Sequence, residues 1–557
     1  MIYLKKSLLL ISIVCFIWSC SDNRKQATLV ISNEVLSPIN KHLFGHFMEK
    51  CSWGGEVGGD LVINPRSGTF DSLILEQLSS MAIPNLRYPG GTDVDYYSWT
   101  ELIDHAPGQT ERKAYREYQK EPGGEVVSDN RLGMNEFLEL CEILEAEPIL
   151  VLNIGQAFLK KQSIQEAKES AAALYAYCNL PEDSGNTWAA YRRLNGREEP
   201  FRVKYFEIGN EYLGFEGFNW KPDYDRGEPV QHLYNCIKAV VDTLYAMDPE
   251  VRLIVDGPIP ELNELLEAGL KEKISYLVSH TYVPWGISSI SKWDSTEADL
   301  SSMTPKQVWN AWVATPAIDT ASGLSVLPSD TYHNAPMNTA FPIAVSEWNW
   351  NGWLEGDPKN AGLPQSDLAK GVGAAGFLHA MMRRGDRLTL ACQSMTVGQS
   401  WGITGIRVDP EYKQESVILP SFLVTGLYSR YHGDSLLHTR YRNIPSYEQA
   451  FRMNSIAPRK KVSTLDMLST RTEKQLFIHV INRSFDEEIK LNIELEGLRV
   501  GKTYQRHGVT GDKLAAISNK SLKQSAEIVT SAFKQSGKSL VLNVPESSVS
   551  VFVFELK

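Results

Sequence analysis

The chain has 557 residues, of which 43% are hydrophobic and 22% are charged. This composition excludes a fibrous or disordered protein and supplies enough apolar surface for more than one domain. The formal net charge is −11, and the sequence has no long run of lysine or arginine. We therefore do not expect nucleic acid as a partner, whereas neutral substrates such as glycans remain compatible with this charge.

The first twenty residues have the pattern of a secretion signal. Lys5 and Lys6 precede an apolar run from Leu8 to Trp18, which is too short for a membrane-spanning helix. No Ala-x-Ala cleavage site follows this run. Instead, the residues from Ile17 to Cys20 resemble a bacterial lipobox. The alternative is an uncleaved membrane anchor.

The lipobox predicts that Cys20 is lipidated after cleavage of a signal peptide at residues 1–20. Residues 21–39 would hold a polar tether and a first strand. We expect a protein that is attached by lipid to the membrane of a bacterial cell envelope. It could face the periplasm or the outside.

Six cysteines would remain after cleavage, and the sequence contains no Cys-x-x-Cys pair. This spacing predicts neither a metal cluster nor a disulfide framework, and we expect no cofactor. Three of the cysteines lie in helical patterns, where a free cysteine is usually a small buried hydrophobic residue. These three are Cys141, Cys178 and Cys236.

From residue 40 to residue 433, short apolar runs alternate with longer helical patterns, which is typical of α/β proteins with a parallel sheet. The sequence predicts eight strands, at 44–49, 85–88, 149–153, 205–209, 252–256, 276–282, 343–347 and 388–394. Helices are predicted at 71–81, 133–145, 163–177, 230–247, 261–268, 304–312, 365–384 and 420–431. Eight such units favour a closed (β/α)8 TIM barrel.

Residues 434–557 have a different pattern, in which apolar and polar residues alternate along strands such as 476–481, 490–494 and 548–555. Alternation of this kind predicts an all-β domain, which we interpret as a jelly-roll-like β-sandwich. Residues 28–32 alternate as well. This early strand therefore could pair with the C-terminal sandwich rather than with the barrel.

Two predicted barrel strands end in a carboxylate. Residues Val203 to Glu211 read as a buried strand that ends in Gly-Asn-Glu, and Ala344 to Glu347 repeats the arrangement. The carboxyl ends of barrel strands form the active-site face. A retaining glycosidase needs two carboxyl groups there, one to protonate the leaving oxygen and one to attack the anomeric carbon. We predict Glu211 as the acid/base and Glu347 as the nucleophile.

The same face carries two long insertions, at 92–131 and at 283–341. Long loops at this end of a barrel usually shape a substrate cleft. Subunit contacts are the alternative for the second insertion, and a homo-oligomer is possible. Trp348 lies next to the predicted nucleophile, which makes it our candidate for stacking against a sugar.

With these residues in view, the chain resembles the α-L-arabinofuranosidases of glycoside hydrolase family 51, which are retaining (β/α)8 enzymes. The resemblance extends through most of the barrel. The matching stretches are LFGHFMEKC from Leu43, NLRYPGGTDVDYYSW from Asn85, GMNEFLELCEILEAEPILVLNIG from Gly133, FEIGNE from Phe206, VSHTYV from Val278, VSEWNW from Val345 and ACQ from Ala391.

The resemblance implies an exo-acting enzyme that uses no cofactor or metal and releases terminal α-L-arabinofuranosyl groups from an arabinose-containing glycan. It gives Glu211 and Glu347 the same catalytic roles as the strand-tip argument. It also implies that a set of further residues binds the sugar: Glu49, Thr92, Asn210, His280, Tyr282 and Gln393.

Two departures concern the sugar rather than the chemistry. Thr92 and Asp93 stand where the family typically has Asn after Pro-Gly-Gly, and Lys50 and Cys51 follow Glu49 where a His is usual. Another glycone therefore remains an alternative, as in a β-xylosidase, β-galactofuranosidase or endo-glucanase. A catalytically dead lipoprotein that binds glycans is a further alternative.

Each site residue also has a structural alternative. Arg87 could hold Glu211 and Glu347 as structural carboxylates, His280 could be a core histidine, and Glu49 could be an ion-pair partner.

Overall fold

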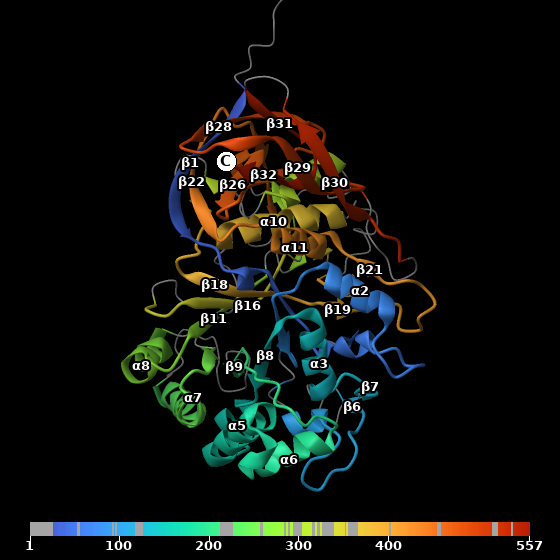
Figure 1. The fold of residues 1–557 in the computed structure, drawn as a ribbon, viewed down its shortest axis with the longest axis vertical. Helices are drawn as coiled ribbons and strands as arrows, with labels where there is room; N and C mark the ends of the chain where they lie inside the picture. The colour runs from blue at the N-terminus through green and yellow to red at the C-terminus, as the bar shows by residue number, and fades with distance from the viewer. Residues whose placement is uncertain are drawn as a thin grey trace, which may run out of the picture.

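The computed structural model consists of a barrel packed against an all-β domain (Figure 1). It describes residues 26–52, 56–91, 94, 97–116, 126–211, 227–256, 260–282, 286–287, 290–292, 304–314, 318–319, 324–325, 339–350, 353–354, 366–399, 403–453, 458–514, 522–535 and 539–557. The predicted signal peptide, Cys20, Thr92 and much of the two insertions lie outside these residues. Among the described helices, none is long and apolar enough to cross a membrane.

Eight parallel strands form the closed barrel in chain order, which confirms the predicted fold. The last strand pairs with the first through Cys392 and Gly45. The strands are β2 (Gly45–Phe47), β5 (Asn85–Tyr88), β8 (Glu147–Leu152), β9 (Tyr205–Ile208), β10 (Arg252–Val255), β11 (Tyr276–Tyr282), β16 (Ile343–Asn349) and β18 (Leu388–Gln393). All of their bounds lie within two residues of the predicted ones.

Helices surround the barrel where the apolar periodicity predicts them. They are α2 (Ser72–Ser80), α3 (Met134–Leu144), α5 (Ile164–Asn179), α7 (Gly227–Met247), α8 (Pro260–Leu270), α9 (Pro305–Trp312), α10 (Asp367–Met382) and α11 (Pro420–Arg430), with the shorter α4 (Gly155–Phe158) and α6 (Thr187–Leu194). Asp71, Ser163, Thr304 and Ser366 accept hydrogen bonds from the first-turn amides of α2, α5, α9 and α10, which fixes where these helices begin.

Alternation along the strands divides the barrel residues into two layers. One set of side chains points into the barrel and fills its lower interior: Phe47, Ile149, Ile254, Val278, Ala344, Leu390 and Cys392. The other set packs outward against the helices in a much larger core. The three cysteines predicted to be buried, Cys141, Cys178 and Cys236, are free and buried as expected.

The C-terminal domain is all-β, as predicted. Nine strands form one continuous sheet in the order β30-β29-β32-β27-β26-β22-β1-β28-β31, and apolar side chains from both halves of this order share a single core. The strands are β1 (Ala27–Pro38), β22 (Ser435–Arg442), β26 (Leu465–Arg471), β27 (Gln475–Asn482), β28 (Ile489–Glu496), β29 (Val500–Gly511), β30 (Ala526–Lys534), β31 (Leu540–Val544) and β32 (Ser548–Leu556).

The early strand β1 lies in this sheet, between β22 and β28. Thr28 pairs with Arg442 in the antiparallel direction and with Asn492 in the parallel direction. The N-terminal strand is therefore part of the C-terminal domain, although the whole barrel separates the two in sequence.

Short strand pairs complete the described structure: β3 (Cys51–Ser52) with β4 (Glu56–Val57), β6 (Tyr115–Arg116) with β7 (Val126–Ser128), β12 (Gly286–Ile287) with β17 (Trp353–Leu354), β13 (Ile290–Lys292) with β24 (Phe451–Met453), β14 (Ile318–Asp319) with β15 (Leu324–Ser325), β23 (Ser446–Gln449) with β25 (Arg459–Ser463), and β19 (Val397–Gly398) with β20 (Ile406–Arg407) and β21 (Val417–Ile418).

A buried ionic cluster around Asp466 joins the two domains. Asp466, on β26, accepts hydrogen bonds from His379 of α10 (2.9 Å), from Arg383 just beyond α10 (2.6 Å) and from Arg483 (3.2 Å). Tyr428 of α11 contacts the other ring nitrogen of His379 at 2.8 Å. Helices α10 and α11 lie between the barrel and the sheet (Figure 1), so this cluster fixes their position against both.

Candidate active site

The turn after β9 presents Glu211 at the carboxyl end of the barrel. Gly209 donates its N–H to the carbonyl of Leu152 and has a φ of 75°, which only glycine adopts without strain. Glu211 itself has a φ of 47°, an uncommon value for a residue with a side chain. Its side chain is 25% exposed. The backbone thus holds Glu211 at the edge of the site, where it can reach both solvent and a ligand.

Glu347 reaches the site because β16 pairs irregularly. The register of β16 against β18 shifts between Val345 and Trp348. A bulge of this kind re-aims side chains, and both Ser346 and Glu347 contact residues of the barrel interior. Glu347 is buried, with 6% of its surface exposed. The two predicted catalytic carboxylates therefore differ in their access to water.

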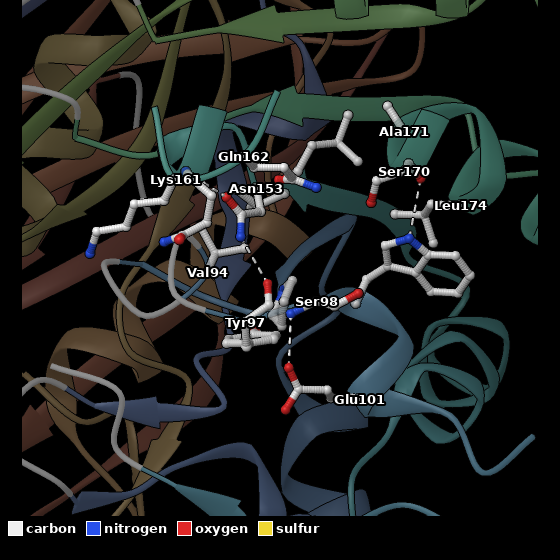
Figure 2. A pocket seen from close by; sticks show the side chains of 15 residues that line it. Val94, Tyr97, Ser98, Glu101, Asn153, Lys161, Gln162, Ser170, Ala171 and Leu174 are labelled. Carbon is white, nitrogen blue, oxygen red and sulfur yellow. Dashed lines mark hydrogen bonds between the residues drawn. The ribbon is translucent and has the colours of Figure 1, made fainter. Parts of the chain in front are cut away.

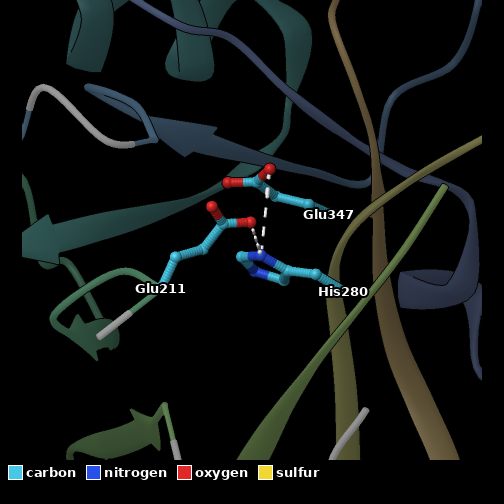
Figure 3. Close-up of side chains that lie close together, drawn as sticks. All are labelled: Glu211, His280 and Glu347. Atoms are coloured by element: carbon cyan, nitrogen blue, oxygen red, sulfur yellow. Dashed lines mark hydrogen bonds and ion pairs between the residues drawn. The ribbon is translucent and has the colours of Figure 1, made fainter. Parts of the chain in front are cut away.

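Glu211, His280 and Glu347 converge at one point (Figure 3), and the ligand atoms of the three side chains lie within 4.8 Å of one another. Nδ1 of His280 lies 2.8 Å from Oε1 of Glu211 and 3.8 Å from Oε2 of Glu347. Retaining glycosidases have carboxyl groups roughly 5–5.5 Å apart, whereas inverting enzymes hold them at roughly 6.5–9.5 Å to admit a water. The upper limit of 4.8 Å between ligand atoms lies below the range of inverting enzymes, so the arrangement fits direct attack by a carboxylate.

Arg87, at the end of β5, holds the nucleophile candidate in place. Its guanidinium donates to Oε1 of Glu347 at 2.8 Å and to Oδ1 of Asn210 at 2.8 Å. It also makes a bidentate contact with Glu207, in which Nε donates to Oε2 at 3.0 Å and Nη2 donates to Oε1 at 2.8 Å. Burial disfavours the charged form of Arg87, but Glu207 and Glu347 hold its pKa above the usual value. Arg87 is thus a permanent cation on the inner side of Glu347.

Tyr282, at the end of β11, contacts the second oxygen of Glu347. Its hydroxyl donates to Oε2 at 2.7 Å and also contacts Oγ of Ser394. Burial and the negative charge of Glu347 raise the pKa of Tyr282 well above its usual value, so the phenol keeps its proton. Both oxygens of Glu347 therefore have fixed donors, which orients the carboxylate.

Glu49 and the Gly90-Gly91 turn form the wall opposite these contacts. A Cβ placed on Gly91 would lie 2.7 Å from Oε1 of Glu49 and 3.5 Å from Oε1 of Glu347. Glycine at this position therefore lets the backbone pass between the two carboxylates. Glu49 is 7% exposed and lies in the same site as Glu347, as the sequence predicts.

Asn210 offers a hydrogen-bond donor to the site. Its Oδ1 is occupied by Arg87, which fixes the orientation of the amide. Its Nδ2 is buried and has no hydrogen-bond partner among the described residues. A buried amide donor that is already oriented in this way is suited to an oxygen atom of a ligand.

His280 carries a positive charge in this environment. Burial opposes its protonation, but the charge of Glu347 and the hydrogen bond to Glu211 raise its pKa from 6.5 to about 9. The histidine is therefore not a neutral core residue. The same three side chains have donor types found in metal sites, but His280 would have to lose its proton before it could bind a cation.

A cavity of about 330 Å³ lies at the same end of the barrel (Figure 2). Pro89, which follows β5, and Leu152, at the end of β8, are part of its lining, and Asn153 donates from Nδ2 to the carbonyl of Tyr97 at 2.9 Å. The carbonyl of Leu152 is the group that accepts from Gly209. The lining also includes Ser170, Ala171 and Leu174 of α5 but none of Glu211, His280 and Glu347, so the cavity lies between the end of β8 and α5 and apart from the three converging side chains.

Comparison with known proteins agrees with this geometry. The sequence matches the family profile described as "Alpha-L-arabinofuranosidase 1 domain" over residues 77–296 and the profile described as "Alpha-L-arabinofuranosidase C-terminal domain" over residues 347–548. The chain belongs to the α-L-arabinofuranosidase family. The first match contains β5 and the Glu211 turn, and the second begins at Glu347.

Individual relatives of this arabinofuranosidase-family chain come from fungi and bacteria. A probable α-L-arabinofuranosidase C from Aspergillus niger is 29% identical over 369 residues, which span 65% of this chain and 67% of the relative. An intracellular exo-α-L-arabinofuranosidase from Bacteroides ovatus is 30% identical over 205 residues, or 36% of each chain. The α-L-arabinofuranosidase structure from Thermotoga maritima shares the fold, with a TM-score of 0.67 and 22% identity over 95% of this chain and 100% of that chain.

The structure does not bring two of the predicted sugar contacts to the converging side chains. Trp348 is fully buried and packs outward against Phe377 of α10, with ring centroids 5.8 Å apart. Gln393 also points outward, where it contacts Ser421 and Thr425 at α11. Both side chains lie between the barrel and its helices because their strand positions alternate with the inward ones. Thr92 lies outside the described residues, so its predicted role stays a prediction.

Three residues of the arabinofuranosidase-family site were missed: Glu207, Ser346 and Ser394. Glu207 is fully buried, accepts from Ser346 at 3.1 Å and neutralises Arg87. Its signal was present in the sequence, because Glu207 lies one strand repeat before Gly209 and thus on the inward face. Ser346 had the same signal, because it lies one strand repeat after the inward-facing Ala344, whereas Glu347 also faces inward only because of the bulge in β16.

Proposed function

We propose that this protein is an exo-acting α-L-arabinofuranosidase that works by double displacement with retention of configuration. The supporting observation is the pair Glu211 and Glu347, which lie close enough for one to attack while the other protonates. Family membership supports the furanosyl glycone. The substrate is an arabinose-containing glycan with a terminal α-L-arabinofuranosyl group.

In the first step, Glu347 attacks the anomeric carbon. Arg87 and Tyr282 hold its two oxygens, so the carboxylate enters the reaction already oriented. The bond to the leaving oxygen breaks as Glu211 delivers a proton to that oxygen. The products of this step are a free alcohol and a glycosyl ester on Glu347.

In the second step, water hydrolyses the ester. Glu211 has lost its proton and accepts one from the attacking water, which is the reverse of its first role. Its partial exposure gives water access to the correct side of the site, whereas the buried Glu347 is shielded from it. Two inversions at one carbon give net retention.

The glycone is held by groups that surround Glu347. The Nδ2 of Asn210, which has no partner in the part of the chain that the structure describes, is placed to donate to the hydroxyl next to the anomeric carbon, and Glu49 is placed to accept from further hydroxyls.

The test is hydrolysis of an aryl α-L-arabinofuranoside by the wild type, by Glu347→Ala and by Glu142→Ala. Glu142 is a matched control, because it is a carboxylate in an ion pair with Arg197 on the surface. We expect turnover by the wild type and the control, and a loss of roughly 10⁴-fold or more in Glu347→Ala. NMR of the first-formed product should show the α-anomer.

The result also separates the alternatives. If the enzyme hydrolyses aryl β-xylosides or β-galactofuranosides and not the arabinofuranoside, the proposed glycone is wrong. The roles of Glu211 and Glu347 would still stand. Binding of arabinosides without hydrolysis of any glycoside would support a glycan-binding protein. Equal rates for Glu347→Ala and the wild type would exclude Glu347 as the nucleophile.

We further propose that lipid on Cys20 attaches the enzyme to the bacterial cell envelope, on the basis of the lipobox in the sequence. Expression in bacteria fed a labelled fatty acid should label the wild type. Cys20→Ala should remove the label, and label retained in this variant would exclude Cys20 as the site.

A further inference from the structure

A continuous line of hydrogen bonds runs beneath the two catalytic carboxylates. It leads from Glu211 to His280 (2.8 Å), from His280 to Ser346 (3.0 Å) and from Ser346 to Glu207 (3.1 Å). Arg87 closes the line between Glu207 and Glu347. Ser346, Glu207 and Arg87 are fully buried, and His280 is 1% exposed. Bulk water therefore cannot replace these contacts.

The directions of these bonds are fixed by Glu207. Its carboxylate accepts from Arg87 at both oxygens and from the hydroxyl of Ser346. A serine has one proton to donate, and a bond to a carboxylate is stronger than a bond to a neutral ring nitrogen. Because that proton points at Glu207, the oxygen of Ser346 must accept from His280, and Nε2 of His280 must carry a hydrogen.

We propose that Ser346 and Glu207 are positioning residues that keep a proton on Nε2 of His280, so that Nδ1 of His280 and Glu211 share the single proton used in catalysis. The proposal rests on the proposed function, since it assigns Glu211 as the acid/base. It adds a place where the catalytic proton resides between turnovers.

The surrounding charges favour His280 as that place. The charged groups that act on its ring are Glu211 from the turn after β9, Glu347 from β16 and Arg87 from β5. Glu347 and Glu211 outweigh burial and Arg87, which is why the pKa of His280 rises to about 9. When Glu347 becomes an ester, its charge disappears and with it much of the attraction that holds the proton.

The proton balance closes over one turnover. In the first step, Nδ1–H passes its proton to Glu211, which gives a proton to the leaving oxygen while Glu347 bonds to the anomeric carbon. His280 is then neutral and Glu211 is a carboxylate. In the second step, Glu211 takes a proton from the attacking water and returns one to Nδ1, and Glu347 leaves as a carboxylate. One proton departs with the alcohol and one arrives with water.

The first experiment compares Ser346→Ala with the wild type on two substrates. For an alkyl α-L-arabinofuranoside, whose leaving group needs the proton, we expect kcat/KM to fall about tenfold or more. For a dinitrophenyl arabinofuranoside, which leaves without protonation, we expect little change. The alkaline limb of the kcat/KM profile should move to lower pH, because the imidazolium loses the group that accepts from Nε2.

Two further variants separate this role from a structural one. Ser346→Thr keeps the hydroxyl. It should restore kcat/KM for the alkyl substrate and return the alkaline limb of the pH profile to its wild-type position. Ser550→Ala is the control, since Ser550 is an equally buried serine of the all-β domain that accepts from Arg506 at 2.9 Å. A loss in Ser346→Ala that is equal for both substrates, with the limb unmoved, would overturn the proposal.

A second measurement does not depend on turnover. In wild-type protein with ¹⁵N-labelled histidine, the signal of His280 is the one that disappears in His280→Gln. At a pH above the alkaline limb, we expect a protonated Nε2 and a bare Nδ1. A neutral ring protonated at Nδ1 would overturn the proposal even if arabinofuranosides are hydrolysed. The expected tautomer without any turnover would instead count against the proposed function alone.

Discussion

The active site and the Asp466 cluster are built from the same side-chain types, yet their histidines differ in charge. In the active site, burial opposes the protonation of His280. The negative charge of Glu347 nevertheless raises the pKa of His280 to about 9. In the Asp466 cluster, burial lowers the pKa of His379 to about 4 although Asp466 lies 2.9 Å away. Contact with one carboxylate therefore does not decide the charge of a histidine.

The difference lies in the balance of charges around each ring. Two carboxylates, Glu347 and Glu211, and one arginine, Arg87, act on the ring of His280. Asp466 is already paired with Arg383 and Arg483, so it has little attraction left for a third cation. Where carboxylates outnumber arginines, the histidine binds a proton that it can transfer. Where arginines outnumber carboxylates, the histidine stays neutral and the cluster holds the two domains together.

The largest expected effect on stability comes from Asp466→Ala. This change leaves Arg383 and Arg483 buried without their anion, and such a loss typically costs about 3–5 kcal/mol of folding free energy. Urea denaturation should show the loss, while kcat per folded molecule stays at the wild-type value. A large loss of kcat in folded Asp466→Ala would contradict the separation between a structural cluster and a catalytic one.

The two histidines should also give opposite dependences of stability on pH. Between pH 6.5 and about 4, the unfolded chain binds a proton at residue 379 that the folded chain does not bind. The free energy of unfolding should therefore fall by roughly 3 kcal/mol as the pH drops through this window. In His379→Gln this part of the acid dependence should be absent, which denaturation at pH 7 and pH 4.5 can measure.

For His280 the window lies on the alkaline side. The folded chain holds a proton between pH 6.5 and about 9 that the unfolded chain releases. Its contribution is complete below pH 6.5 and is lost as the pH rises to about 9, by roughly 3 kcal/mol at most. His280→Gln should flatten the alkaline side only. Flattening of the same side in both variants would remove the contrast between the clusters.

The smallest effect is expected at an ion pair that also links the two domains but is exposed. Lys306 of α9 and Asp486 lie 2.8 Å apart, with side chains that are 49% and 51% exposed. Exposed pairs of this kind contribute about 0–1 kcal/mol. Lys306→Met should therefore change the urea midpoint far less than Asp466→Ala does. Equal changes would show that burial is not what makes the Asp466 cluster important.

Sequence reasoning predicts the parts of this molecule that depend on local pattern. Apolar runs and helix caps give the eight barrel units, and Gly-Asn-Glu at a strand tip identifies Glu211. The other site positions depend on which way a strand faces: Trp348 and Gln393 point outward, and the bulge in β16 lets Glu347 point inward directly after Ser346. A bulge is set by tertiary contacts, so alternation alone does not reveal it.

The Asp466 cluster lies beyond sequence reasoning for a different reason. His379, Asp466 and Arg483 come from separate elements whose contact exists only once the two domains have docked. None of these residues, taken singly, indicates its partners in the sequence.

The position of β1 sets an order for the assembly of the chain during synthesis. This strand leaves the ribosome before any part of the barrel, yet its partners are β22 and β28, so Thr28 must wait for Arg442 and Asn492. The barrel in between can form as soon as β18 is made, since its own pairings end there. Until β22 emerges, β1 keeps both edges open, and its second edge stays open until β28 follows, so the nascent protein must protect one unpaired strand for most of its translation.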